Sequence, residues 1–349
     1  MRGARWVNRP EGSNWGDFGP DDRLGRINLL TPERVRAAAA EVIDGVRHCL
    51  SLPLTLPGGS ELNPNRRPPV LRPTRRPGEV NFNFEMRRIQ DGRTDVLSDD
   101  LAVLHLQYST QWDSLAHAGA LFDADGDGIP EPVYYNGYRA GVDVLGPEEL
   151  TDSGFADLDE RTTSSGGPLG IEHLARAGAQ GRGVLIDLRH HLGDERTPVG
   201  YDLLAEIMAA DGVEVGEGDL VCLHTGFGQR LVDMGGDPDP EVLHGACAAL
   251  DGRDERLKRW ITETGLAALI ADNYAVEQLP ARPADPPAPA LPLHEHCLFK
   301  LGVHLGELWY LTPLAADLRA RGRSRFLLTA PPLHLPGAVG SPANPIATL

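Results

Sequence analysis

The chain has 349 residues, of which 41% are hydrophobic, and it is rich in glycine (40) and proline (29). This composition is typical of a loop-rich globular enzyme and argues against a helical bundle or a fibrous protein. The formal net charge of −17 argues against a nucleic-acid partner, because phosphate binding normally needs a basic face.

The first predicted element in chain order is a helix. Thr31 is suited to be its N-cap, Pro32 occupies the first helical position, and Gly45 is expected to end it. An N-terminal arm (1–30) precedes this helix, and an excursion (58–79) rich in proline, arginine and asparagine follows it. We expect the excursion to be mobile.

Short apolar strands and helices alternate through the rest of the chain. Strands are predicted at 51–57 (an edge strand), 99–108, 183–188, 219–224 and 266–271. Helices are predicted at 171–177, 201–210, 255–264 and 312–321. This alternation favours an α/β fold with a central mixed β-sheet flanked by helices. No break in composition marks a linker, so we expect a single domain over residues 1–349.

Further features of the whole chain narrow its class. No apolar run approaches the roughly 20 residues that span a bilayer, and the N-terminus lacks the apolar stretch of a signal peptide. We therefore expect no membrane partner and a cytoplasmic location. The four cysteines show no CxxC spacing, which argues against a disulfide framework and a thiolate metal site. All basic residues except Lys258 and Lys300 are arginines, a bias that indicates a GC-rich bacterial genome.

An acidic loop, 123–131, carries acidic side chains at alternate positions and a glycine at a sharp turn, as calcium-binding loops do. It departs from the EF-hand pattern because Ile129 comes one place early and Tyr134 stands where a bidentate glutamate is needed. Two interpretations remain, a structural Ca²⁺ site and an acidic β-turn at a loop tip.

Four residues carry side chains that bind metals or move protons. If the fold brings them together, Asp113, His294 and Glu307 would make a three-ligand site for Zn²⁺ or Mn²⁺. His117 would then be the proton carrier beside that site. The alternative is structural, with Asp113 and His117 as a turn-capping pair and His294 in a surface loop.

The segment 107–117 resembles the motif H-x-G-T-H-x-D-x-P-x-H of the putative cyclase family, the kynurenine formamidase-like hydrolases. In that motif the first two histidines and the aspartate bind metal, and the last histidine is the catalytic acid/base. Asp113 and His117 match the aspartate and the last histidine, whereas Gln107 and Gln111 replace the two histidine ligands. The pattern Thr-Gln-Trp-Asp resembles a distinct branch of the family that uses glutamine here.

The resemblance extends over most of the chain. His294 and Glu307 match later ligands of the family, and the segments 14–22, 218–226 and 337–346 are similar to family segments. It implies a swivelling β/β/α fold, arylformamidase-like hydrolase chemistry, and a homodimer or homotetramer.

The two glutamines leave the metal content open, because a carboxamide oxygen is a much weaker ligand than an imidazole. In one interpretation Asp113, His294 and Glu307 hold one divalent ion, zinc or manganese. In the other no metal binds, the same residues and His117 do acid–base chemistry directly, and the glutamines donate hydrogen bonds to a substrate oxygen. The residues expected to contact the substrate are Gln107, Gln111, Trp112 and His224.

We therefore expect a metal-dependent hydrolase or cyclase that acts on an amide, ester or lactone-type carbonyl of a small molecule. Asp113 and His117 are its expected catalytic residues. One alternative is a metal-independent cyclase or dehydratase of a biosynthetic pathway. Another is a catalytically silent protein that binds a small molecule.

Overall fold

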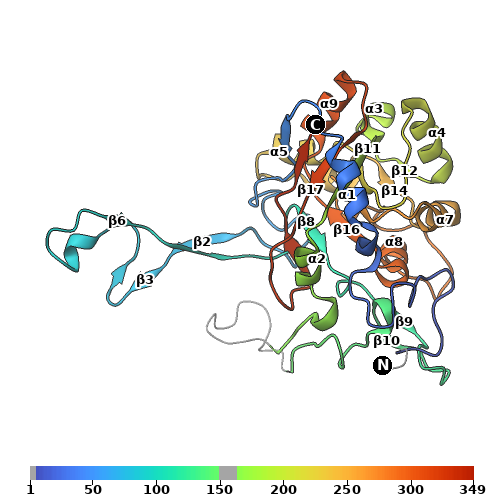
Figure 1. Ribbon diagram of the computed structural model, residues 1–349, viewed down its shortest axis with the longest axis horizontal. Coiled ribbons are helices and arrows are strands. Elements are labelled where there is room, and N and C mark those ends of the chain that lie inside the picture. Colours follow the sequence, from blue (N-terminus) through green and yellow to red (C-terminus); the bar gives the residue numbers. More distant parts are fainter. Residues whose placement is uncertain (1–4, 149–162) are drawn as a thin grey trace.

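A mixed sheet of nine strands forms the centre of the computed structural model, which describes residues 5–148 and 163–349 (Figure 1). Its strand order is β1-β19-β17-β11-β13-β15-β16-β8-β18. The parallel strands at its centre are β11 (Gln180–Asp187), β13 (Leu220–His224), β15 (Ala268–Ala271) and β16 (His304–Glu307). Antiparallel strands complete it on both sides: β8 (Gln111–Asp113), β18 (Gly340–Pro342), β17 (Arg325–Thr329), β19 (Ile346–Thr348) and β1 (Arg47–Cys49).

Both faces of this sheet are buried, which explains why its central strands are apolar without interruption. Successive side chains of a strand point to opposite faces. Val184 and Ile186 of β11 therefore belong to one hydrophobic core, while Leu185 between them belongs to another. Val221 and Cys222 of β13 divide in the same way. The predicted α/β fold with a central mixed sheet flanked by helices is confirmed.

Helices pack against both faces of the sheet. Among those that contribute to the first core are α4 (Tyr201–Asp211), α7 (Glu255–Thr264) and the π-helix η6 (Glu295–Leu301), which continues α8 (Pro292–His294). Those that contribute to the second core are α2 (Glu172–Ala177) and α9 (Thr312–Ala320). Further helices are α1 (Pro32–Ala39), α3 (Leu188–Leu192), α5 (Phe227–Met234) and α6 (Pro240–Gly245), with the 3₁₀ turns η1 (Gly25–Leu29), η2 (Met86–Arg88), η3 (Tyr135–Gly137) and η5 (Gly167–Leu169). Within the described ranges, none of the helices has both the length and the apolar character that crossing a membrane requires.

Two predictions of local structure are wrong. Helix α1 ends at Ala39 rather than at Gly45, whose N–H instead donates to the carbonyl of the C-terminal residue. The segment 51–57 is not an edge strand, because it makes only an isolated β-bridge at Ser51. Its two prolines lack the N–H donors that continued pairing would need.

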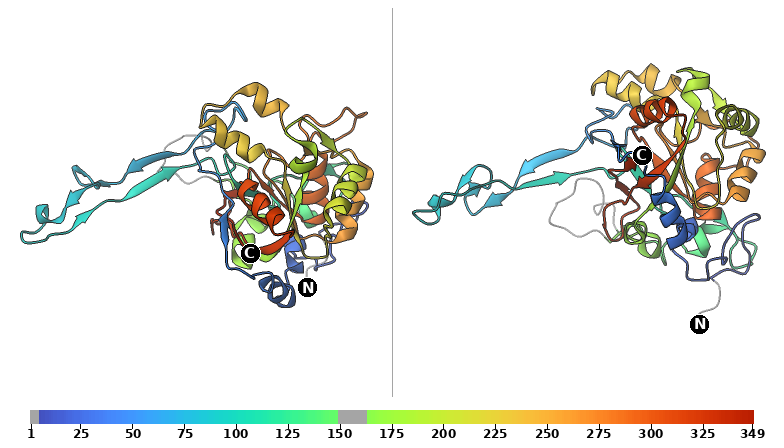
Figure 2. Two further views of the ribbon diagram at one scale, coloured as in Figure 1. Left: turned by 90° about the horizontal axis from the view of Figure 1, so that it is seen from above. Right: turned by 45° about the horizontal axis from the view of Figure 1, so that its top comes forward.

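A long two-stranded ribbon leaves the body of the domain and projects away from it in every view (Figures 1 and 2). We call residues 66–103 the β arm. Its antiparallel pairs are β2 (Val70–Pro73) with β7 (Asp100–Val103), β3 (Arg75–Arg76) with β4 (Glu79–Val80), and β5 (Phe84–Glu85) with β6 (Val96–Leu97). The predicted excursion 58–79 covers only the outgoing half of this ribbon. The strand predicted at 99–108 is shorter than expected and belongs to the returning half.

Two smaller sheets lie on the body, β9 (Ala120–Phe122) with β10 (Glu131–Val133), and β12 (Pro198–Val199) with β14 (Ala249–Leu250). The predicted N-terminal arm is described from residue 5 onward, and its first four residues lie outside the described ranges. Trp15 holds the N-terminal arm against the body. Its indole N–H donates to the carbonyl oxygen of Phe299 at 2.8 Å, and its ring packs edge-on against the ring of Phe299.

Candidate functional site

The residues predicted to carry the chemistry meet on one face of the neighbouring strands β8 and β16. These strands pair antiparallel, with Glu307 directly opposite Gln111. Because side chains alternate along a strand, Gln111 and Asp113 share the face on which Glu307 lies. His117 comes from the loop after β8, and His294 is the last residue of α8. Residues nearly two hundred positions apart in the sequence are therefore neighbours.

Three of these side chains form a group whose ligand atoms all lie within 4.8 Å of one another. We call Asp113, His117 and His294 the buried group. Nε2 of His117 lies 3.9 Å from Oδ1 of Asp113. Asp113 is fully buried, and neither of its carboxylate oxygens has a hydrogen-bond partner among the described residues. A buried carboxylate without a partner is costly, and beside two imidazoles it fits a bound divalent cation.

Glu277 holds His294 in place, and nothing in the sequence pointed to this residue. Oε1 of Glu277 lies 2.8 Å from Nδ1 of His294, and the carboxylate also accepts the backbone N–H groups of Leu293 and His294. Nε2 of His294 is thereby directed to Oε1 of Glu307, at 3.4 Å. Burial lowers the pKa of His294, but the hydrogen bonds to Glu277 and Glu307 outweigh burial and raise that pKa to about 10. Such a carboxylate–histidine pair is the usual support of a metal-binding imidazole.

The two carboxylates of the site have opposite pKa shifts. Burial raises the pKa of Asp113, and the negative charge of Glu307 adds to the rise. Burial also works to raise the pKa of Glu307, but the hydrogen bond and charge of His294 outweigh it and hold that pKa below its ordinary value. Nε2 of Gln111 donates to Oε2 of Glu307 at 3.0 Å, so the ionised form of Glu307 is well supported.

Gln107 contacts the ring of His117 from the side away from Asp113. Its amide nitrogen lies 3.0 Å from Nδ1 of His117. An amide nitrogen can only donate, so in this arrangement the proton of the neutral imidazole is on Nε2, toward Asp113. Gln107 therefore controls which ring nitrogen of His117 carries the proton.

A family model described as putative cyclase matches residues 80–278 of the chain. The chain belongs to the putative cyclase family. Its fold is similar to that of a crystal structure of a novel cyclase, with 30% sequence identity over 97% of each chain and a TM-score of 0.72. The resemblance inferred from the motifs is confirmed.

Two more distant structures share the fold. Isatin hydrolase A from Ralstonia solanacearum is 15% identical, with a TM-score of 0.55 over 91% of this chain and 97% of the hydrolase. Isatin hydrolase A from Labrenzia aggregata, bound to benzyl benzoate, is 12% identical, with a TM-score of 0.52 over 89% and 94% of the two chains. Identities this low show a common fold alone. A search of curated proteins found no match.

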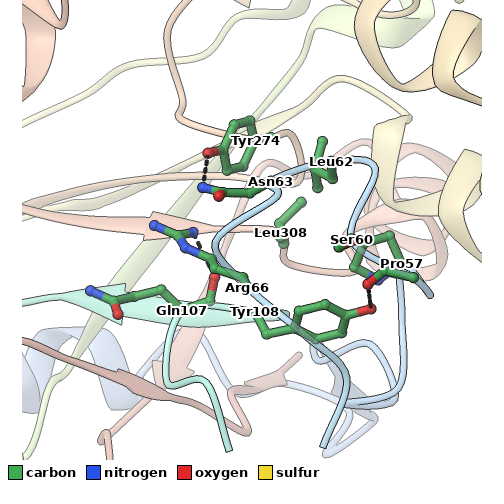
Figure 3. Close-up of a pocket in the computed structure, with 10 residues that line it drawn as sticks. Pro57, Ser60, Leu62, Asn63, Arg66, Gln107, Tyr108, Tyr274 and Leu308 are labelled. Atoms are coloured by element: carbon green, nitrogen blue, oxygen red, sulfur yellow. Dashed lines mark hydrogen bonds between the residues drawn. The ribbon is translucent and has the colours of Figure 1, made fainter. Parts of the chain in front are cut away.

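Two hollows border the site of this cyclase-family chain. The smaller has an interior of about 10 Å³, room for about one water molecule. Figure 3 shows Arg66 lying between Gln107 and Tyr274 in it, and Nη1 of Arg66 donates to the Gln107 carbonyl oxygen at 2.6 Å. The larger, of about 630 Å³, is lined by His294, by β9 and by the loop 287–291. Of these two hollows, the larger is the one with room for a small organic molecule, and His294 is among the residues that line it.

Two residues expected to contact the substrate lie elsewhere in the cyclase-family fold. Trp112 points to the opposite face of β8, where it packs edge-on against Trp309 with ring centroids 5.2 Å apart. His224 lies at the end of β13 in another network, 2.7 Å from Oδ1 of Asp187 and 3.1 Å from Oγ1 of Thr312. The structure brings neither residue into contact with the buried group.

The predicted calcium loop also places ligand atoms within 4.8 Å of one another. We call Asp123, Asp125 and Glu131 the loop group. Oxygens of Asp123 accept the backbone N–H groups of Gly126 and Gly128. The guanidinium of Arg139 lies 3.3 Å from Asp125 and 3.4 Å from Glu131. These partners already compensate the carboxylates, which favours the acidic-turn interpretation over a calcium site.

Proposed function

We propose that this chain is a metal-dependent hydrolase or cyclase that acts on an amide, ester or lactone carbonyl of a small molecule. The observation that carries the proposal is Asp113, whose fully buried carboxylate has no hydrogen-bond partner in the described ranges and lies beside two imidazoles. Membership of the cyclase family and the fold shared with isatin hydrolases support chemistry at a carbonyl.

The donors present fit zinc or manganese, because both ions accept imidazole nitrogen and carboxylate oxygen. Asp113 and His294 would supply two ligands. Glu307, 3.4 Å from His294, would supply the third ligand. His117, which lies in the same group of ligand atoms as Asp113 and His294, is the alternative third ligand. A bound ion would supply Lewis acidity, which polarises a carbonyl and makes water more acidic.

His117 would move the proton. When Gln107 turns its carboxamide so that the oxygen accepts Nδ1–H, Nε2 is free to take a proton from water. The water oxygen then adds to the carbonyl carbon, the C–N or C–O bond breaks, and Nε2–H returns the proton to the leaving nitrogen or oxygen. Glu277 keeps His294 oriented throughout, and Gln111 donates a hydrogen bond to the carboxylate of Glu307.

The test begins with metal analysis of protein purified without chelator. We expect about one equivalent of zinc or manganese, and turnover of at least one probe among isatin, an N-formyl arylamine and an aryl ester. A metal content below ~0.2 equivalents, with none taken up on soaking, would exclude the metal-dependent mechanism.

The same assays separate the two rival functions. Turnover by metal-free protein that His117→Ala abolishes would identify a metal-independent cyclase or dehydratase. Binding of the probes without turnover, with or without metal, would identify a silent binding protein.

A further inference from the structure

The polar groups that border the smaller hollow point in one direction. Figure 3 shows the hydroxyl of Tyr274, the guanidinium of Arg66 and the carboxamide of Gln107 turned to the same side. The amide nitrogen of Gln107 lies 3.0 Å from Nδ1 of His117, so this is the side on which His117 lies. The hollow therefore presents its polar groups to the proton carrier of the candidate site.

Two of these groups have hydrogen-bond donors that the described part of the chain does not use. Nδ2 of Asn63 donates to the hydroxyl oxygen of Tyr274 at 2.8 Å, which leaves the O–H of Tyr274 to donate elsewhere. The guanidinium of Arg66 donates to the carbonyl oxygen of Gln107 and makes no ion pair with a described residue, so further N–H groups remain. A hydroxyl and a cation with unused donors are suited to bind a negatively charged oxygen.

The hollow has room for one oxygen atom and for little more. Its interior of about 10 Å³ holds about one water molecule, so the organic body of a substrate belongs in the larger hollow, which His294 lines. The ring centroids of His117 and His294 are 6.2 Å apart. A carbonyl group beside His117 can therefore have its body in the larger hollow and its oxygen at the smaller one.

The charge of Arg66 acts on the carboxylates of the site. Burial is the largest influence on the pKa values of Asp113 and Glu307 and works to raise both, whereas the positive charge of Arg66 works to lower both. Burial also raises the pKa of Tyr274, so its hydroxyl keeps the proton and remains a donor. The field of Arg66 thus reaches the place where the chemistry occurs.

An unusual turn holds Tyr274 at the hollow. Ala275 and Val276, the next two residues, have φ angles of 77° and 60°, which are rare for any residue except glycine and rarest for a β-branched one. Strained backbone of this kind persists only where the surrounding structure holds it, and it is concentrated at functional sites. The same turn ends at Glu277, which orients His294, so it positions both residues for the site.

We propose that Arg66 and Tyr274 form an oxyanion-binding pair for the reaction described above, an inference that rests on the proposed function. When the oxygen of water adds to the carbonyl carbon, the π electrons of the C=O bond move to the carbonyl oxygen, which becomes negatively charged. The guanidinium and the hydroxyl donate hydrogen bonds to this oxygen and keep their own protons. The electrons then re-form the C=O bond while the bond to the leaving nitrogen or oxygen breaks.

Steady-state kinetics of the full chain give the first test. Tyr274→Phe removes only the O–H donor, and Arg66→Met removes the charge. Each should lower kcat about 10²- to 10³-fold with little change in KM, because the donors act on charge that develops only in the transition state. The matched controls are Tyr310→Phe, which loses a hydrogen bond to Gln229, and Arg67→Met at an exposed neighbour. Both controls should keep kcat.

Binding of phenylphosphonate gives a second test that needs no turnover. The tetrahedral centre of this probe carries negatively charged oxygens, as the reacting carbonyl does after water has added. Calorimetry should give a dissociation constant at least about 10-fold higher in Tyr274→Phe and in Arg66→Met than in the wild type, because a hydrogen bond to a charged oxygen is lost. The two control variants should keep the wild-type affinity.

The two tests separate failure of this inference from failure of the proposed function. A wild type that turns over a probe, with kcat unchanged in Tyr274→Phe and Arg66→Met, would overturn the inference and leave the proposed function standing. Equal binding of phenylphosphonate by the wild type and both variants, or none by the wild type, would overturn it whatever the kinetics. A wild type that binds phenylphosphonate through the pair but turns over no probe would contradict the proposed function and keep the pair as an anion-binding site.

Discussion

Among the residues that the structure describes, two groups of three side chains place their ligand atoms within 4.8 Å of one another, the buried group and the loop group. In the loop group, backbone N–H groups and Arg139 already compensate the carboxylates. In the buried group, Asp113 has no hydrogen-bond partner among the described residues. Close spacing of donor atoms is therefore not enough to make a metal site. What distinguishes the buried group is a fully buried carboxylate that accepts no hydrogen bond from the described residues and has imidazoles beside it.

The sharpest test of this comparison removes one carboxylate charge from each group. Asp113→Asn should abolish metal binding and with it turnover, because an amide oxygen is a weak ligand at the centre of the group. Asp125→Asn should leave both unchanged. Metal content by elemental analysis and titration with Zn²⁺ measure the effect. Equal losses of metal binding in the two variants would contradict the assignment of the metal site to the buried group.

His117→Ala decides whether that residue moves protons or holds the ion. As the acid/base, its loss should lower the rate about 10²- to 10⁴-fold while the metal stays bound. Rate and metal content are measured on the same preparation. Loss of the metal would make His117 the third ligand in place of Glu307, and an unchanged rate would remove it from the mechanism.

Glu277→Gln tests whether the hydrogen bond from Glu277 to His294 strengthens metal binding by the buried group. The carboxylate orients His294 through Nδ1, so its neutralisation should weaken metal affinity about 10- to 100-fold. The matched control is Glu172→Gln, another buried glutamate, which bonds to Gly337 and has no contact with the buried group. Competition with a metal indicator gives both affinities. Similar affinities in the two variants would leave Glu277 a purely structural role.

His304 is a buried histidine that belongs to neither of the two groups of ligand atoms found among the described residues. Burial lowers its pKa to about 3, from an ordinary value of 6.5. Between these values the unfolded chain binds a proton that the folded chain does not, so the free energy of unfolding falls as the pH falls from about 6.5 toward 3. The slope is at most about 1.4 kcal/mol per pH unit for this residue.

Urea unfolding at pH 7.5 and pH 5.5 measures this dependence. His304→Gln should reduce the loss of stability between the two pH values by about 1 kcal/mol, whatever its effect at either pH alone. His296, whose pKa burial lowers to about 4, keeps its own contribution in the variant. An identical pH dependence in wild type and variant would contradict the prediction.

Local patterns predicted the elements of the second half of the chain well. The helix at 255–264 has the predicted bounds, and the strand predicted at 219–224 begins one residue later as β13. Both depend on local information, an N-cap aspartate in the first case and a continuous apolar run in the second. The edge strand at 51–57 failed because pairing depends on a partner strand, which no local pattern reveals.

The candidate site also has a part that the sequence predicted and a part that it did not. Residue types and motif spacing singled out Asp113, His117, His294 and Glu307, and the structure brings all four together. The spacing of the motif could not show that Trp112 belongs to the core. Successive side chains of a strand point to opposite faces of the sheet, so Trp112 lies on the face opposite to Gln111 and Asp113. The sequence did not predict a role for Glu277, because this residue acts through a hydrogen bond to His294, which belongs to another element.

By itself, the sequence determined the chemistry available to this protein: its family, its alternating strands and helices, and two glutamines where the family motif has histidines. Only the tertiary structure decided that Asp113 of the buried group is desolvated and accepts no hydrogen bond from the described residues, whereas Asp123 of the loop group does. It also decided that the excursion is part of a long arm that projects from the body. Burial and pairing arise from contacts between residues far apart in the chain, so no local spacing specifies them.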